Sequence, residues 1–211
     1  MAATRLEERR GVVRNLRRWA TWVADRALGW VFLRLHRRYR VGGMTVILSD
    51  TSAAGDLSLQ RIGSALDTLR SLDPARAARV GRWVKHVIVW PGHYTAYDKW
   101  GGIHLASRHL AAPPVILASA LVHEATHLRI AKRGIPYDPA RRARIEKLCV
   151  QEQAAFLRKA PIDGPRWADQ VEQGLNEPWW TEADREARVH RSLQEAQLPD
   201  WLAPLLFRPQ K

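Results

Sequence analysis

The segment His123-Glu124-Ala125-Thr126-His127 places two metal-binding side chains and one carboxylate within five residues. On a helix, side chains four positions apart project from one face, so both imidazoles can reach a single ion. Imidazole nitrogens bind Zn²⁺ at roughly 2.0–2.1 Å. Glu124 is rotated about 100° from His123, which places it beside the metal rather than on it. The spacing predicts a Zn²⁺ site at which Glu124 acts as catalytic base toward an activated water.

The setting of this motif favours a metal over two ordinary core histidines. Seven of the eight residues Val115–Val122 are apolar, with Ser119 the exception, so the histidines enter on a buried helix. Two buried imidazoles without ligands are costly unless they are hydrogen-bonded. Cys149 is the only cysteine, which excludes a cysteine-rich zinc site, and we assign it to core packing. The metal ligands must therefore be histidines and carboxylates.

A catalytic zinc usually has three protein ligands, and the third is expected from the helix that follows the motif. Glu146 and Glu152 are the candidates. An antiparallel helix that returns after a short turn regains the height of the motif near residue 146, which favours Glu146. Periodicity favours Glu152, because it shares a stripe with apolar residues of the same helix. Both remain open, with Glu146 preferred.

The HEATH segment, followed by eighteen residues and then Glu146, resembles the gluzincins, the thermolysin and aminopeptidase N group of zincin-type HExxH metallopeptidases. The resemblance covers roughly residues 84–160. It implies a zincin-like fold, with His123, His127 and Glu146 as zinc ligands and Glu124 as catalytic base. It identifies no branch, because Val150 stands where thermolysin-like enzymes carry Asp. Metzincins are excluded, since Ile130 and Arg133 replace the residues that continue their motif.

Two further parts of a peptidase site are expected. Zincins run an edge strand beside the motif helix, and the substrate adds to it through main-chain hydrogen bonds. Ile103–Ser107 is our candidate for that strand, with an ordinary sheet strand as the alternative. A donor for the developing oxyanion is also expected. The role is left unassigned among Tyr94, Tyr97, Tyr137 and His190.

Apolar periodicity and Gly/Pro breaks predict an α+β layout: a small mixed or antiparallel sheet, the motif helix, an antiparallel helix after it, and helices at both ends. Strands are expected at 44–48, 86–90 and 103–107. Helices are expected at 12–40, 57–72, 74–83, from Pro114 to a stop at Gly134, at 140–159, and as two or three short helices in 165–211. The domains are then residues 1–42, a basic amphipathic helix; 43–164, the catalytic domain; and 165–211, a helical extension packed on it.

The basic charge of the chain belongs mainly to its N-terminal segment. Residues 1–40 carry eleven arginines against three acidic residues, a net of +8 out of +13 for the whole chain. A tryptophan, phenylalanine and leucine stripe runs opposite these arginines. Such a helix can lie on an anionic membrane surface, or it can pack its stripe on the domain and leave the arginines in water. Nucleic acid is not the expected partner.

The motif predicts a zinc-dependent hydrolase that cleaves peptide or amide bonds in a peptide or protein substrate. The alternative is a non-catalytic zincin-fold module that binds a protein or regulates transcription. An intact Glu124 favours the enzyme, since a scaffold has no need of it. A single cysteine and the lack of a signal or spanning segment fit a cytoplasmic protein, peripheral to a membrane if residues 1–40 attach there.

We predict that residues 1–40 are a peripheral attachment rather than part of the catalytic core. Truncation before Gly42 should leave the melting temperature unchanged and abolish binding to anionic vesicles. A collapsed melting temperature, with no vesicle binding by either form, would show instead that the helix is core structure.

Overall fold

The computed structural model describes residues 36–48, 54–90, 95–97 and 101–176, together with positions 187, 190, 191 and 194. The chain divides into two compact units, residues 1–37 and 38–211. The predicted basic helix lies, up to residue 35, outside the described residues. All the described helices and strands belong to the second unit.

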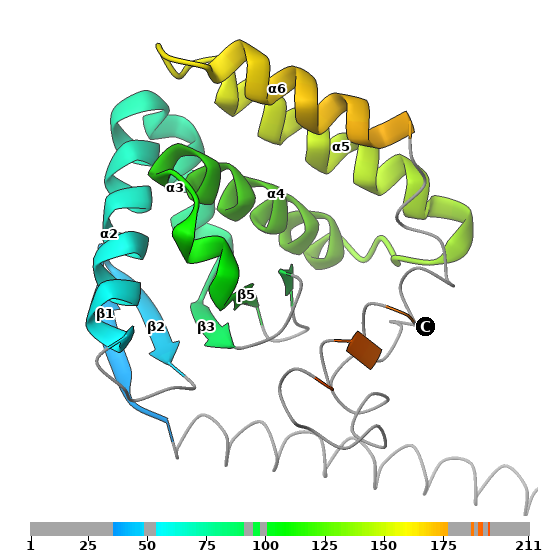
Figure 1. Cartoon of the computed structure of the whole chain (residues 1–211). Coiled ribbons are helices and arrows are strands. Elements are labelled where there is room, and N and C mark those ends of the chain that lie inside the picture. Colours follow the sequence, from blue (N-terminus) through cyan, green and yellow to red (C-terminus); the bar gives the residue numbers. More distant parts are fainter. Residues whose placement is uncertain are drawn as a thin grey trace, which may run out of the picture. The chain divides into compact units, whose positions relative to one another are not determined.

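A five-stranded mixed sheet forms one layer of this unit, in the order β1-β2-β3-β5-β4 (Figure 1). Its parallel centre pairs β2 with β3 and β3 with β5, while β1 and β4 are antiparallel strands at the two edges. The bounds are Arg38–Val41 (β1), Met44–Leu48 (β2), His86–Trp90 (β3), Ala96–Tyr97 (β4) and Gly102–Ala106 (β5). The predicted strands at 44–48 and 86–90 are confirmed, and the third lies one residue earlier than predicted.

The segment Arg38–Val41 corrects one prediction. It is a strand paired with β2, whereas the sequence pattern extended the N-terminal helix to residue 40. Gly42 and Gly43, read as a helix end, form the two-residue turn between the strands, with φ of 55° and 82°. Positive φ at both turn positions matches the twist of a β-hairpin and suits glycine. The sheet therefore begins at Arg38 rather than after residue 42, and a truncation that spares it must cut before Arg38.

Five α-helices accompany the sheet in the described part of the chain, which confirms the α+β class. Their bounds are Ala54–Leu72 (α2), Pro74–Trp83 (α3), Pro114–Lys132 (α4), Pro139–Leu157 (α5) and Gly164–Gln173 (α6), with short 3-10 turns at Ser107–Ala111 and Gly174–Asn176. The helices α3, α4 and α5 each begin with a proline in the first turn, where its missing N–H costs no hydrogen bond. None of the described helices is long and apolar enough to cross a bilayer.

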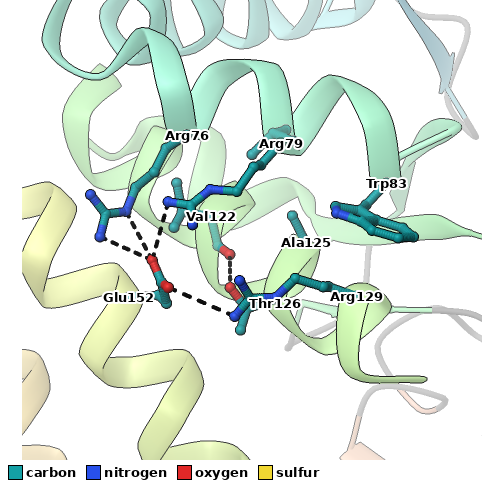
Figure 2. A pocket seen from close by; sticks show the side chains of 9 residues that line it. Arg76, Arg79, Trp83, Val122, Ala125, Thr126, Arg129 and Glu152 are labelled. Carbon is teal, nitrogen blue, oxygen red and sulfur yellow. Dashed lines mark hydrogen bonds and ion pairs between the residues drawn. The ribbon is translucent and has the colours of Figure 1, made fainter. Parts of the chain in front are cut away.

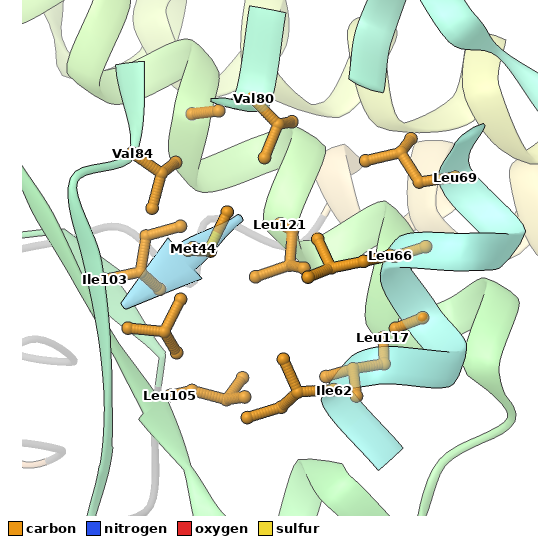
Figure 3. Packing of buried hydrophobic residues seen from close by; sticks show 14 of the residues in the cluster. Met44, Ile62, Leu66, Leu69, Val80, Val84, Ile103, Leu105, Leu117 and Leu121 are labelled. Carbon is orange, nitrogen blue, oxygen red and sulfur yellow. The ribbon is translucent and has the colours of Figure 1, made fainter. Parts of the chain in front are cut away.

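The hydrophobic core lies between one face of the sheet and the helices α2, α3 and α4. Alternate strand residues point into it, among them Met44, Ile103 and Leu105, and Leu117 and Leu121 of α4 meet them there (Figure 3). The helix α4 also contacts α5, and α6 packs along α5 (Figure 1). Twelve residues of α4, including the whole motif, are consequently buried. The motif helix is the centre of this unit.

The carboxylate of Asp73 connects α3 to the end of α5. It accepts a hydrogen bond from the backbone N–H of Arg76 as the N-cap of α3, and it pairs with the Arg76 side chain at 2.5 Å and with Lys159 Nζ at 2.8 Å. Burial raises the pKa of this carboxyl, but the bonds from Lys159 and Arg76 outweigh it and lower the pKa from 3.8 to about 2. The charged form therefore stabilises the fold.

Replacement of Asp73 by Asn keeps a good N-cap residue but removes the charge. At pH 7 the variant should lose about 2 kcal/mol of unfolding free energy, since a depressed pKa adds stability above the unfolded value. That difference should shrink as the pH falls from about 4 through about 2, where the native carboxylate is protonated. Urea denaturation at several pH values measures this.

The matched control is Asp67→Asn, because Asp67 pairs with Arg70 on an exposed face of α2. It should change the free energy of unfolding by less than about 0.5 kcal/mol. Equal effects of the two substitutions would contradict the role assigned to Asp73.

Candidate metal centre

The hairpin of α4 and α5 brings the predicted site residues together. Gly134, with φ of 74°, follows the end of α4, and Asp138 caps α5 by accepting the N–H of Arg141. Only six residues separate the helices, so α5 returns antiparallel along α4. This return brings Glu146 level with the histidines of the motif.

Three donor groups converge between these helices. His123 Nε2 and His127 Nε2 are 3.2 Å apart. Glu146 Oε2 lies 3.5 Å from His123 Nε2, and its Oε1 lies 3.5 Å from His127 Nε2. All three residues are buried, and Glu146 is only 3% exposed. The structure thus brings together the two histidines and the carboxylate that the sequence favoured.

These separations fit a zinc ion. Ligands about 2.05 Å from a tetrahedral metal are about 3.3 Å from each other, close to the observed 3.2 and 3.5 Å. Glu146 Oε2 is buried without a hydrogen-bond partner among the described residues, and so is His127 Nδ1. Burial raises the pKa of Glu146, but the two imidazoles hold it well below its usual range. The donor set of two imidazoles and one carboxylate is therefore poised for a cation.

Glu124 lies beside this cluster on α4 and is 7% exposed. Burial raises the pKa of its carboxyl, and the negative Glu146 adds to the increase, while the nearby imidazoles of His123 and His127 oppose it. A carboxyl whose pKa is raised is better suited to taking up and returning a proton. Glu124 follows His123 directly on α4 and interacts electrostatically with both imidazoles and with Glu146.

The edge strand is β4 rather than the predicted Ile103–Ser107. The segment at 103–106 is β5, which pairs on both sides and is interior to the sheet. The prediction failed because β4 has only two residues, too few for any periodicity to show. Tyr97 of β4 stacks on His127, with ring centroids 5.0 Å apart and planes at 15°. The edge strand thus contacts the candidate metal centre directly.

Two tyrosines surround the histidines. Tyr137, from the turn between α4 and α5, donates its hydroxyl to Glu146 Oε1 and lies edge-on to His127. Burial and the neighbouring Glu146 raise the pKa of this hydroxyl, so it stays protonated as a donor. Tyr94 lies outside the described residues, and His190 is exposed. Among the candidate donors that the structure describes, Tyr97 and Tyr137 contact the cluster.

Glu152 points away from the histidines. It lies in a small pocket on another side of α4, where Arg76, Arg79 and Arg129 surround its carboxylate at 2.9–3.7 Å (Figure 2). This cluster ties α3, α4 and α5 together. Because six residues rotate a helix by about 600°, Glu152 lies about 120° around α5 from Glu146. The geometry therefore gives Glu152 an ion-pair role.

Cys149 adds a donor that the sequence analysis assigned to the core. It packs with Ile130 and Ile145, and its Sγ lies within 4.8 Å of nitrogens of both histidines. Burial raises the pKa of the thiol well above its usual range, and Glu146 and Glu124 add to the increase. The Glu146 carboxylate lies 3.5 Å from an imidazole nitrogen of each histidine, and these imidazoles keep its pKa low, so it is charged where the thiol is neutral. We therefore rank Glu146 ahead of Cys149 as third ligand.

Sequence reasoning missed the side chains that form hydrogen bonds on the Nδ1 side of His123. Gln153 accepts from His123 Nδ1 at 3.1 Å and contacts Ser119 at 3.1 Å. A signal existed, because Gln153 lies seven residues after Glu146 and seven residues make nearly two full turns of a helix. Ser119 lies one turn before His123 and was the lone polar residue of the apolar run. Both follow the stripe that faces the other helix.

Comparisons with known proteins add no relative: no family model matches the chain, and none of the curated proteins or solved structures matches it significantly.

We predict that each chain binds one Zn²⁺. His123→Ala should abolish zinc binding almost completely, and Glu146→Ala should lower the zinc affinity more than about 100-fold. Loss of a zinc ligand should lower the affinity for zinc by more than the roughly 10–100-fold that follows when only a residue orienting a ligand is lost. Glu152→Ala and Cys149→Ala should keep the metal. Zinc analysis and competition with a chelator measure this.

Glu152→Ala is the matched control, since it removes a carboxylate from the same helix without touching the histidines. Circular dichroism verifies that each variant is folded. Full zinc retention in His123→Ala would exclude the site, and loss in Cys149→Ala with retention in Glu146→Ala would make Cys149 the third ligand.

Proposed function

We propose that this protein is a zinc-dependent hydrolase that cleaves peptide or amide bonds. One observation carries the proposal: two imidazoles and a carboxylate meet within 3.2–3.5 Å in a buried place, with a second carboxylate, Glu124, next to them. A buried group of this kind costs stability without a cation to compensate it. Functional sites are where such costs are tolerated.

The residues have distinct parts in this proposal. His123, His127 and Glu146 would hold Zn²⁺, which when bound would supply Lewis-acid chemistry toward the scissile carbonyl and a water molecule. Glu124 takes the proton of the attacking water and returns it to the leaving nitrogen, and its raised pKa suits both transfers. Tyr137 holds Glu146 through its hydroxyl. Tyr97 stacks on one face of the His127 ring.

The substrate we propose is an extended peptide. The position of β4 at the end of the strand order supports this, because an extended peptide can add to the end of a sheet through main-chain hydrogen bonds. Tyr97 belongs to that strand and contacts His127, so a peptide bound there would pass the metal centre. This gives the peptide backbone, rather than one particular side chain, the main part in recognition.

We also propose a zincin-like fold and a cytoplasmic location for this protein. A zincin-like fold is supported by the order of a mixed sheet with an antiparallel edge strand, a motif helix and a returning helix with its glutamate. A cytoplasmic location is supported by the single, buried cysteine.

Glu124→Gln tests the mechanism. The amide has nearly the shape of the carboxylate but cannot act as a base, so turnover should fall by at least about 10²–10⁴-fold. Zinc content and melting temperature should stay as in the wild type. A mixed peptide library, with newly formed amino groups measured over time, supplies the assay without assuming a sequence preference.

The wild-type protein stripped of zinc and then reloaded is the control for contaminating peptidases. Activity that survives in Glu124→Gln would remove Glu124 from the mechanism. A wild type that binds zinc but cleaves no member of the library, at any enzyme concentration used, would favour the non-catalytic binding module.

A further inference from the structure

Gln153 and Ser119 form a chain of hydrogen bonds behind His123. Ser119 Oγ donates to the carbonyl oxygen of Ile116 at 2.8 Å. Gln153 Nε2 donates to Ser119 Oγ at 3.1 Å, and Gln153 Oε1 lies 3.1 Å from His123 Nδ1. Ser119 is fully buried and Gln153 is half-buried, so the chain crosses the interface of α4 and α5.

The direction of each bond in this chain is fixed by chemistry. Ile116 O can only accept, so the Ser119 hydroxyl gives it its single proton. Ser119 Oγ must then accept from its other neighbour, which orients the Gln153 amide with Nε2 toward Ser119 and Oε1 toward His123. A carbonyl oxygen next to Nδ1 requires a proton on Nδ1. The neutral imidazole therefore carries no proton on Nε2.

The orientation matters because Nε2 is the atom that faces the other donors. It lies 3.2 Å from His127 Nε2 and 3.5 Å from Glu146 Oε2. A flipped Gln153 amide would present its NH₂ group to Nδ1 and favour the opposite tautomer, with a proton directed into the cluster. One buried hydroxyl, that of Ser119 two hydrogen bonds away, thus decides which nitrogen of His123 has a free lone pair.

We propose that Gln153, held by Ser119, is a positioning residue that fixes the Nδ1–H tautomer of His123 and thereby preorganises Nε2 as a ligand for Zn²⁺. The proposal rests on the proposed zinc site, but the tautomer can be measured without metal. His127 is held differently. Its Nδ1 has no hydrogen-bond partner among the described residues, and Tyr97 and Tyr137 pack against its ring instead. The polar chain therefore serves one histidine only.

Three substitutions separate positioning from mere packing. Gln153→Leu removes the acceptor and should weaken zinc binding about 10–100-fold. Gln153→Glu keeps an acceptor for Nδ1 and should restore binding to within about 3-fold of the wild type. Ser119→Ala leaves the amide free to rotate and should give an intermediate loss. Gln151→Leu, at an exposed position of the same helix, is the matched control and should bind like the wild type.

The second readout is the ¹⁵N spectrum of the imidazoles in the full-length protein after zinc removal, at a pH where they are neutral. His123 should show a protonated Nδ1 and a bare Nε2 in the wild type and in Gln153→Glu. It should show a mixture of tautomers in Gln153→Leu, with an unchanged circular dichroism spectrum.

The experiments distinguish failure of the proposed zinc site from failure of the positioning role of Gln153. A wild type that binds no zinc would remove the proposed function, and the spectra would still decide the positioning role. Unchanged zinc affinity and an unchanged tautomer in a folded Gln153→Leu variant would overturn the inference while leaving the zinc site in place. Weak binding in both Gln153→Leu and Gln153→Glu, with no change of tautomer, would reduce Gln153 to a packing residue.

Discussion

The structure around the motif depends on one constraint, the burial of the Glu146 carboxylate against two imidazoles. A carboxylate that is 3% exposed has to be compensated from within the protein. The imidazoles favour its charged form, and the hydroxyl of Tyr137 donates to one of its oxygens. Since these groups come from α4, α5 and the turn between them, the spacing of the two helices is tied to the chemistry of the site.

The placement of α4 makes this burial achievable. The sheet core, α2, α3 and α5 surround it, so the motif helix has no solvent-facing stripe over most of its length. The polar side chains on different sides of α4 therefore have different partners. His123 and His127 face Glu146 and Gln153 on α5, while Arg129 on another side reaches Glu152 in the arginine cluster (Figure 2). Two carboxylates of one helix thus serve two unrelated purposes.

Sequence patterns predicted the elements whose apolar residues and caps are strong: β2, β3, α3 and the hairpin of α4 and α5. They failed at β1, where arginines alternate with Tyr39 and Val41 and continue the basic run before it. They failed at β4 because two residues carry no period. Periodicity also favoured Glu152, since a helix packed on both α4 and α6 has apolar residues on more than one stripe. The axial argument from turn length placed Glu146 where the structure has it.

Residues behind the site were missed for a different reason. A motif identifies groups that would touch the metal, whereas an orienting residue is defined by the helix packed opposite. Ser119 and Gln153 become partners only because α5 runs antiparallel at a register fixed by the turn from Arg133 to Asp138 and by the cap at Asp138. A turn longer or shorter by one residue would rotate and shift α5. Other residues of α5 would then face α4 in place of both Glu146 and Gln153. The length of that turn is therefore as much a part of the candidate site as the motif itself.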